Sequence, residues 1–198
     1  SRREAGEGGY VRGVRSSPVL EDTSRSVARN GAGDMRCALM GGPSQTPPDA
    51  KVAGLIELVL TRFHEVHRKE FPEAIRLARK VEAVHADHPQ CPAGLADHLA
   101  VMLADLESHQ HREEEVLFPM MLAGGNPMIR FPIGRMMEEH DEVGAQLVEL
   151  RALTHDSETP QGACATWRAL LAACRKLDCD LREHMRLENE VLFASFLG

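Results

Sequence analysis

His109-Gln-His-Arg-Glu-Glu-Glu-Val-Leu-Phe118 and His184-Met-Arg-Leu-Glu-Asn-Glu-Val-Leu-Phe193 are two copies of one pattern. In each copy a glutamate follows a histidine by four residues, and a Glu-Val-Leu-Phe run begins two residues after that glutamate. A lone histidine precedes each copy at nearly the same distance: His64 lies 45 residues before His109, and His140 lies 44 before His184. Residues four apart share one face of a helix. The repeat therefore predicts a metal site with pseudo-twofold ligation.

The chain from Lys51 onward has helical periodicity throughout, in four segments at 52–84, 94–122, 132–153 and 161–196. Stretches rich in proline, glycine and other turn residues separate the segments. Four long helices joined by short connections predict an all-α protein, an up-down-up-down four-helix bundle. Pro72 lies inside the first segment. It predicts a kink or a division near Phe71, with His64 on the first half.

The first fifty residues differ from the rest. They hold eight of the sixteen glycines and four of the eleven prolines, and they show no helical or strand period. We interpret residues 1–50 as a disordered or irregular leader without a recognisable domain, and residues 51–198 as the bundle. The chain lacks an apolar run of signal-peptide or membrane-spanning length, so no association with a membrane is expected.

Charge and cysteine content disfavour two further classes of protein, those that bind nucleic acid and those built on disulfides. The net charge is −7; the first fifty residues, with seven Arg against six acidic residues, contribute +1, and the remainder contributes −8. An acidic domain with one Trp and one Tyr is a poor candidate for binding nucleic acid. Five cysteines without a C-x-x-C pair disfavour a disulfide framework and favour a reducing, cytoplasmic location.

The histidines and glutamates of the repeat fall within apolar rows that step by three or four residues. In the second segment the row runs from Leu95 to Val116, and in the fourth from Ala163 to Val191. In the third segment it includes Met136 or Met137. Members of these rows are expected to face the bundle core, and the polar ones are His109, Glu113, His140, His184 and Glu188.

Two readings without a metal compete with this one. A single His-x3-Glu pair can be an exposed contact worth a few tenths of a kcal/mol, but two such pairs in apolar rows would place unpaired carboxylates in the core. Buried His–Glu hydrogen bonds without a metal stay possible. Four imidazoles and two carboxylates are too many for one tetrahedral zinc, whereas two ions can share them. Nitrogen and oxygen ligands without thiolate suit iron or manganese.

Residues 55–193 resemble the hemerythrin-like HHE domain and, more closely, the iron–sulfur cluster repair family. The matching stretches are Arg62-Phe-His64-Glu-Val-His67-Arg, Val81-Glu-Ala-Val-His85-Ala-Asp, Glu113-Glu-Glu-Val-Leu-Phe-Pro119, Glu139-His140-Asp141, Ala163-Cys-Ala-Thr-Trp167 and Leu187-Glu-Asn-Glu-Val-Leu-Phe193. The resemblance implies a non-haem di-iron centre of two Fe ions, bridged by oxo and by the carboxylates of Glu113 and Glu188. The ligands it implies are His64, His109, Glu113, His140, His184 and Glu188. His64 depends more on the family than on the rows.

Other polar residues receive secondary roles. Asp105 and Glu139 match family positions tied to iron access, although the family usually has Glu where Asp105 stands; both can equally be solvated or neighbouring carboxylates. His67 is one turn from His64 and can support a ligand. His85 lies roughly 30 Å along a straight helix from His64, too far to join the same centre. Cys164 is interpreted as a structural, partly buried thiol.

The resemblance implies that the protein supplies iron to iron–sulfur clusters damaged by nitrosative or oxidative stress, with apo cluster proteins as partners. One alternative is an enzyme that reduces nitric oxide at a diferrous centre, with Asp105 and Glu139 supplying protons. Another is a module that binds or senses oxygen or nitric oxide. Hemerythrins typically have five histidines at the centre and this chain shows four, which favours reactivity over reversible carriage. A homodimer is a further expectation.

Overall fold

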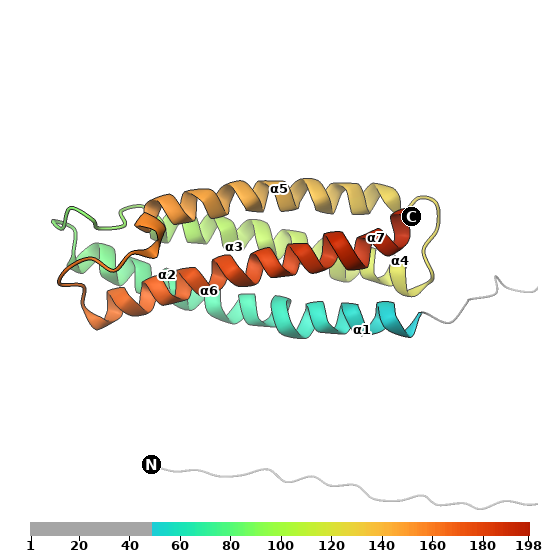
Figure 1. Ribbon diagram of the computed structural model, residues 1–198, viewed down its shortest axis with the longest axis horizontal. Helices are drawn as coiled ribbons and strands as arrows, with labels where there is room; N and C mark the ends of the chain where they lie inside the picture. Colours follow the sequence, from blue (N-terminus) through green and yellow to red (C-terminus); the bar gives the residue numbers. More distant parts are fainter. Residues whose placement is uncertain (1–48) are drawn as a thin grey trace, which may run out of the picture. The chain divides into compact units, whose positions relative to one another are not determined.

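The computed structural model describes residues 49–198, so the predicted leader at 1–50 lies almost wholly outside the described part of the chain. Within that part the protein is a bundle of four long helical rods without strands (Figure 1). The all-α prediction and the up-down-up-down order are confirmed. No helix among the described residues is both long enough and apolar enough to cross a membrane.

Three of the four rods consist of α-helix interrupted by a π-helical turn. The first rod is α1 (Ala50–Leu58), η1 (Val59–His64) and α2 (Glu65–Val84), and the second is α3 (Leu95–Arg112), η2 (Glu113–Leu117) and α4 (Phe118–Leu122). The third is α5 (Arg130–Leu153), which a 3-10 turn, η3 (His155–Ser157), follows. The fourth is α6 (Ala165–Leu187), η4 (Glu188–Phe193) and α7 (Ala194–Leu197).

Two local predictions about helix boundaries were wrong. The first rod is not divided at Pro72, because α2 continues through that residue, and the irregular turn of the rod is η1, which ends at His64. The fourth rod begins at Ala165 and not at residue 161, because Gly162 adopts a positive φ of 81° and Cys164 is extended. The connection between α5 and α6 is therefore longer than the sequence suggested.

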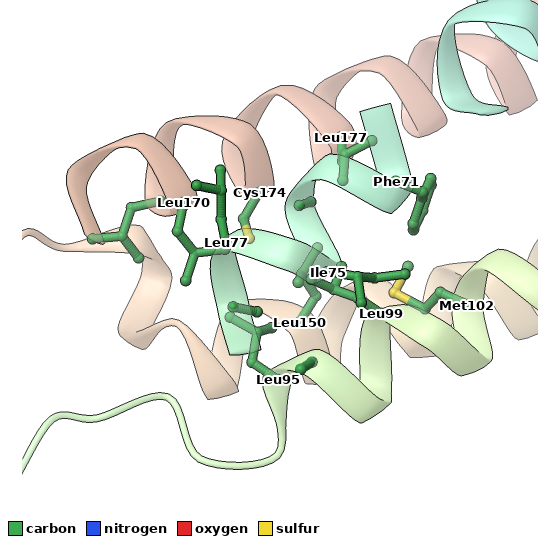
Figure 2. Close-up of a cluster of buried hydrophobic side chains, with 14 of the residues drawn as sticks. Phe71, Ile75, Leu77, Leu95, Leu99, Met102, Leu150, Leu170, Cys174 and Leu177 are labelled. Atoms are coloured by element: carbon green, nitrogen blue, oxygen red, sulfur yellow. The ribbon is translucent and has the colours of Figure 1, made fainter. Parts of the chain in front are cut away.

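The interior consists of two apolar clusters with a polar layer between them. The larger cluster includes Phe71, Leu99 and Trp167, and Figure 2 shows part of it, with side chains from α2, α3, α5 and α6. The smaller cluster, which includes Ile133 and Phe193, is formed near the π-helical turns by the opposite ends of the rods. Each buried large aliphatic or aromatic side chain contributes about 1.5–3 kcal/mol to folding. The clusters hold the rods in register and so fix the polar layer between them.

Candidate metal centre

All six predicted ligands lie in the polar layer between the apolar clusters. His64 ends η1, His109 is in α3, His140 in α5 and His184 in α6, while Glu113 and Glu188 begin η2 and η4. Each of the six is at most 4% exposed. The structure thus brings together every residue that was assigned as a ligand, including His64, which the apolar rows alone did not predict.

The donor atoms form two overlapping groups, within each of which they lie no more than 4.8 Å apart. One group contains His64 and His184, the other His109 and His140, and both contain Glu113 and Glu188. Glu113 Oε2 lies 3.3 Å from His64 Nε2 and 3.4 Å from His109 Nε2. The two Glu188 oxygens lie 3.1 Å from His184 Nε2 and 3.2 Å from His140 Nε2. Each carboxylate therefore stands between one histidine of each group, the position of a bridging ligand.

The carboxylates stand at the start of π-helical turns, which explains where the predicted rows fail. A π-helical turn holds an extra residue and rotates everything after it relative to the preceding α-helix. Val116, predicted to be buried, is 49% exposed, and Leu117 is buried in its place. In the fourth rod Val191 is half-buried while Leu192 is fully buried. π-Turns concentrate at functional sites, and here two of them begin at the carboxylates Glu113 and Glu188.

Three of the four histidines are oriented by a hydrogen bond at Nδ1. The partners are Glu114 for His64 at 2.7 Å, Asn189 for His140 at 2.8 Å, and Glu139 for His109 at 2.8 Å. Such bonds fix the ring so that Nε2 faces the centre, as in proteins whose histidines bind metal.

Two of these partners were missed by the sequence reasoning, although the repeat contains their signal. Glu114 and Asn189 occupy the same place in the two copies, directly after the carboxylates Glu113 and Glu188. Each bonds to the lone histidine that precedes its own copy, His64 or His140. The pseudo-twofold pattern thus extends from the candidate ligands to the groups that orient them.

The protein alone leaves many donor atoms of this layer unpaired. Among the described residues, His64 Nε2, His184 Nε2 and both oxygens of Glu113 and Glu188 are buried without a well-aligned hydrogen bond, although histidine nitrogens and carboxylate oxygens of the layer lie 3.1–3.4 Å apart. A buried charge without a partner is among the most costly features a protein can contain, whereas a carboxylate that binds a cation is compensated. Unpaired nitrogen and oxygen atoms on converging side chains therefore fit a pair of cations.

The histidines and carboxylates of the layer shift one another's pKa values. Burial disfavours the charge on Glu188, yet His184 and His140 hold the pKa of that carboxyl well below its usual value. Burial would likewise lower the pKa of His109, but Glu113 and Glu188 raise it to about 9. Without a cation, a proton on His109 balances part of the carboxylate charge. Metal binding must displace that proton.

Comparison with known sequences supports this assignment. The sequence model of the family described as "Hemerythrin HHE cation binding domain" matches residues 56–196. The chain belongs to the hemerythrin HHE family. The sequence resemblance to this family is thereby confirmed, and the match includes all six candidate ligands of the HHE domain.

Two curated relatives of the HHE chain bear the same name. The chain is 44% identical over 142 residues to the iron-sulfur cluster repair protein YtfE of Yersinia pseudotuberculosis serotype O:1b (strain IP 31758), over 72% of this chain and 64% of the relative. It is 42% identical over 163 residues to the protein of that name from Dickeya chrysanthemi (strain Ech1591), over 81% of this chain and 74% of the relative. The HHE chain thus spans somewhat under two thirds of the length of the Yersinia protein.

Glu139 and Asp105 take different positions in the HHE domain. Glu139 is 5% exposed, and its second oxygen accepts bonds of 2.8 Å from Arg112 and Arg135. Asp105 is exposed and accepts a 2.7 Å bond from Gln146. Both line a cavity of about 260 Å³ that reaches His109. Glu139 therefore supports a candidate ligand directly, while Asp105 lies on the wall of the approach to it.

Replacing Glu139 tests that support. We expect Glu139→Ala to weaken cation binding at the centre by about 10–100-fold, because the His109 ring loses the carboxylate that orients it and raises its basicity. The measurement is a competition titration of ferrous iron against a coloured chelator. Glu138→Ala is the matched control, since Glu138 is the adjacent residue of α5 and its side chain is 71% exposed. Equal affinity in the two variants would contradict the orienting role.

Cys164 is half-buried, as expected, but it also has chemical partners. Its Sγ lies 3.2 Å from His85 Nε2 at the start of α6. The Trp167 backbone N–H and the His85 ring lower the pKa of the thiol to about 7. His85 also packs on Trp167, with ring centroids 4.8 Å apart, and it belongs to neither donor group, in agreement with the prediction that it is no ligand.

The lowered pKa predicts selective reactivity. At pH 7 we expect iodoacetamide to label Cys164 at least tenfold faster than Cys174, whose thiol has a pKa that burial raises to about 12. His85→Ala should slow labelling of Cys164 severalfold, because the helix start still stabilises the thiolate. Peptide mass spectrometry over a time course measures both rates. An unchanged rate in the variant would show that His85 does not assist ionisation.

Proposed function

We propose that this HHE domain binds two iron ions and supplies iron for the repair of damaged iron–sulfur clusters. The observation that carries the proposal is the pair of buried donor groups that share Glu113 and Glu188. One ion would be held by His64 and His184, the other by His109 and His140. The repair role rests on the printed names of relatives at 42–44% identity, which cover 72–81% of this chain.

The donor set suits release as well as binding. Neither donor group contains a cysteine, so each ion would be held by imidazole and carboxylate, ligands that exchange protons for metal near neutral pH. When bound, the two irons would supply redox chemistry and ferrous ions for transfer. The chain's own residues hold the ions, orient the rings and exclude bulk water from the layer.

The approach to the centre offers carboxylate oxygens to a moving cation. The cavity that reaches His109 is lined by Asp105, Glu139 and Glu142, and also by Arg112 and Arg135, both of which bond to Glu139. Burial opposes the charge on Glu139, but Arg112 and His109 keep its pKa below the usual value, so it is ionised at neutral pH. A ferrous ion leaving the centre on this side meets carboxylate oxygens along the wall.

Transfer of iron to an apo cluster protein tests the proposal. The iron-loaded chain is mixed under argon with an apo ferredoxin, a sulfide source and a reductant, and the visible absorption of the cluster is followed. We expect cluster formation to match the iron lost from the HHE chain. An equal concentration of the Glu188→Ala variant, treated with iron in the same way, is the control. Iron that stays on the loaded chain under reducing conditions would rule out the supply role.

Reduction of nitric oxide is a second candidate, favoured by the position of Glu139. Its carboxylate lies 2.8 Å from the His109 ring and lines the cavity that reaches His109, so it can relay a proton from the cavity toward the centre. Gas analysis of the reduced, iron-loaded chain under single-turnover conditions tests this candidate. Nitrous oxide at the level of a metal-free control would exclude it.

A further inference from the structure

His67 is a buried imidazole without an evident partner. It lies in α2, three residues after His64, and is 0% exposed. Neither ring nitrogen has a hydrogen-bond partner among residues 49–198. Buried polar side chains are nearly always paired, because an unpaired one loses its bonds to water without replacement. A group that enters the site from outside the chain is the natural partner to look for.

The neighbours of His67 show that it lies near one side of the candidate metal centre. Its ring centroid lies 6.2 Å from Phe63 and 6.4 Å from Phe71, which are apolar, and 5.6 Å from the candidate ligand His184. An imidazole carries at least one N–H in either protonation state, so the His67 ring can donate a hydrogen bond.

His67 lies outside the donor set itself. It belongs to neither group of donor atoms within 4.8 Å of one another. Three of the candidate ligands have an acceptor at Nδ1 that orients the ring, whereas His67 has none among the described residues. Its place is thus beside the position shared by His64 and His184, close enough to meet a small molecule there.

Only the first half of the pseudo-twofold repeat has a buried histidine three residues after its lone histidine. His64 and His140 are equivalent in the pseudo-twofold pattern, and the residue three after His140 is Val143. Val143 is buried at the corresponding place in the second half and offers no hydrogen bond. The two metal positions therefore have similar donors but unequal neighbours.

We propose that His67 donates a hydrogen bond to a small anion bound on the His64–His184 side of the centre. This inference rests on the metal centre proposed above, but not on transfer of iron to another protein. It assigns anion binding to one of two positions that the donor groups alone would leave equivalent. The N–H of the ring can donate to an acceptor atom of a small anion such as azide.

Azide binding to the iron-loaded, oxidised full chain tests the inference. We expect His67→Leu to retain two irons per chain and to bind azide about tenfold more weakly than the wild type, as measured by visible absorption. His67→Gln, which keeps an N–H donor, should recover most of that loss. The metal-free His67→Leu chain should melt at the same temperature as the wild type or a few degrees higher, because an unpaired polar group has been removed.

Four results would overturn the inference. Equal azide affinity in wild type and His67→Leu would show that the ring does not contact the anion. Loss of one iron from His67→Leu would make His67 a ligand. A lower melting temperature of metal-free His67→Leu, with no recovery of azide binding in His67→Gln, would make the ring a packing element. A wild-type chain that binds no iron would remove the centre itself. A chain that binds iron and azide as expected, yet transfers no iron, would contradict the repair role alone.

Discussion

Glu188→Ala should abolish binding of both ions of the proposed di-iron centre, whereas His109→Ala should abolish binding of about one. Glu188 contributes an oxygen to each donor group, since its carboxylate lies 3.1 Å from His184 Nε2 and 3.2 Å from His140 Nε2. Its loss leaves each group with three donors and removes half of the negative charge that the two cations share. His109 belongs to a single group, so the other group keeps all four donors.

Iron per chain, measured by elemental analysis after anaerobic loading and gel filtration, distinguishes the two variants. Glu190→Ala is the matched control, because Glu190 lies two residues further along the same helical turn and its side chain is 65% exposed. We expect two irons per chain in the control, about one in His109→Ala and none in Glu188→Ala. One iron retained by Glu188→Ala would show that the carboxylate serves a single ion and does not bridge.

The period of the apolar residues was sufficient to predict the bundle and most of the site. His109, Glu113, His140, His184 and Glu188 lie in rows that step by three or four, and such rows face the core of a helical bundle. Burial of a histidine with a glutamate four residues away then has few explanations besides a cation. His64 is different, because its segment contains no second ligand that would show which helix face points to the core. Its assignment as a ligand came from the family resemblance.

The rest could not be predicted because it depends on departures from the regular helix. A fixed period of 3.6 cannot foresee the extra residue of a π-turn, so Val116 was placed inside when Leu117 takes that position. Pro72 predicted a kink or a division near Phe71, yet α2 is undivided there and the irregular turn lies upstream at η1. The partners Glu114 and Asn189 become visible only when the repeat is compared position by position and the folded rods bring them to His64 and His140.

The metal-free protein should lose stability as the pH rises from about 6.5 to 9. Burial opposes protonation of His109, but Glu113 and Glu188 raise its pKa from the ordinary 6.5 to about 9. A group whose pKa is higher in the folded state stabilises that state below the unfolded value and loses this contribution as the pH passes the folded value. The difference corresponds to roughly 3 kcal/mol, and the pKa of His64, raised chiefly by Glu113 against the effect of burial, acts in the same direction.

Glu188 sets the opposite limit. Its pKa in the folded state lies well below the usual 4.5, because His184 and His140 outweigh the effect of burial. It therefore stabilises the metal-free protein above pH 4.5 and ceases to do so as the pH falls. Together the two groups place the pH of maximum stability of the metal-free chain between about 4.5 and 6.5.

Urea unfolding of the metal-free chain at pH 6, 7.5 and 9 measures this dependence, with the iron-loaded chain and metal-free His109→Gln as controls. The midpoint should fall with pH in the wild type and fall less in His109→Gln, which carries no titrating ring at that place. In the iron-loaded chain the metal ions compensate the carboxylate charge in place of protons. The urea midpoint of that chain should therefore change little over the same pH range. Iron affinity should rise over that range, because metal and proton compete for the same nitrogens. A midpoint of the metal-free wild type that is flat from pH 6 to 9 would mean that His109 is neutral in the folded chain and that Glu113 and Glu188 are stabilised by some other cation.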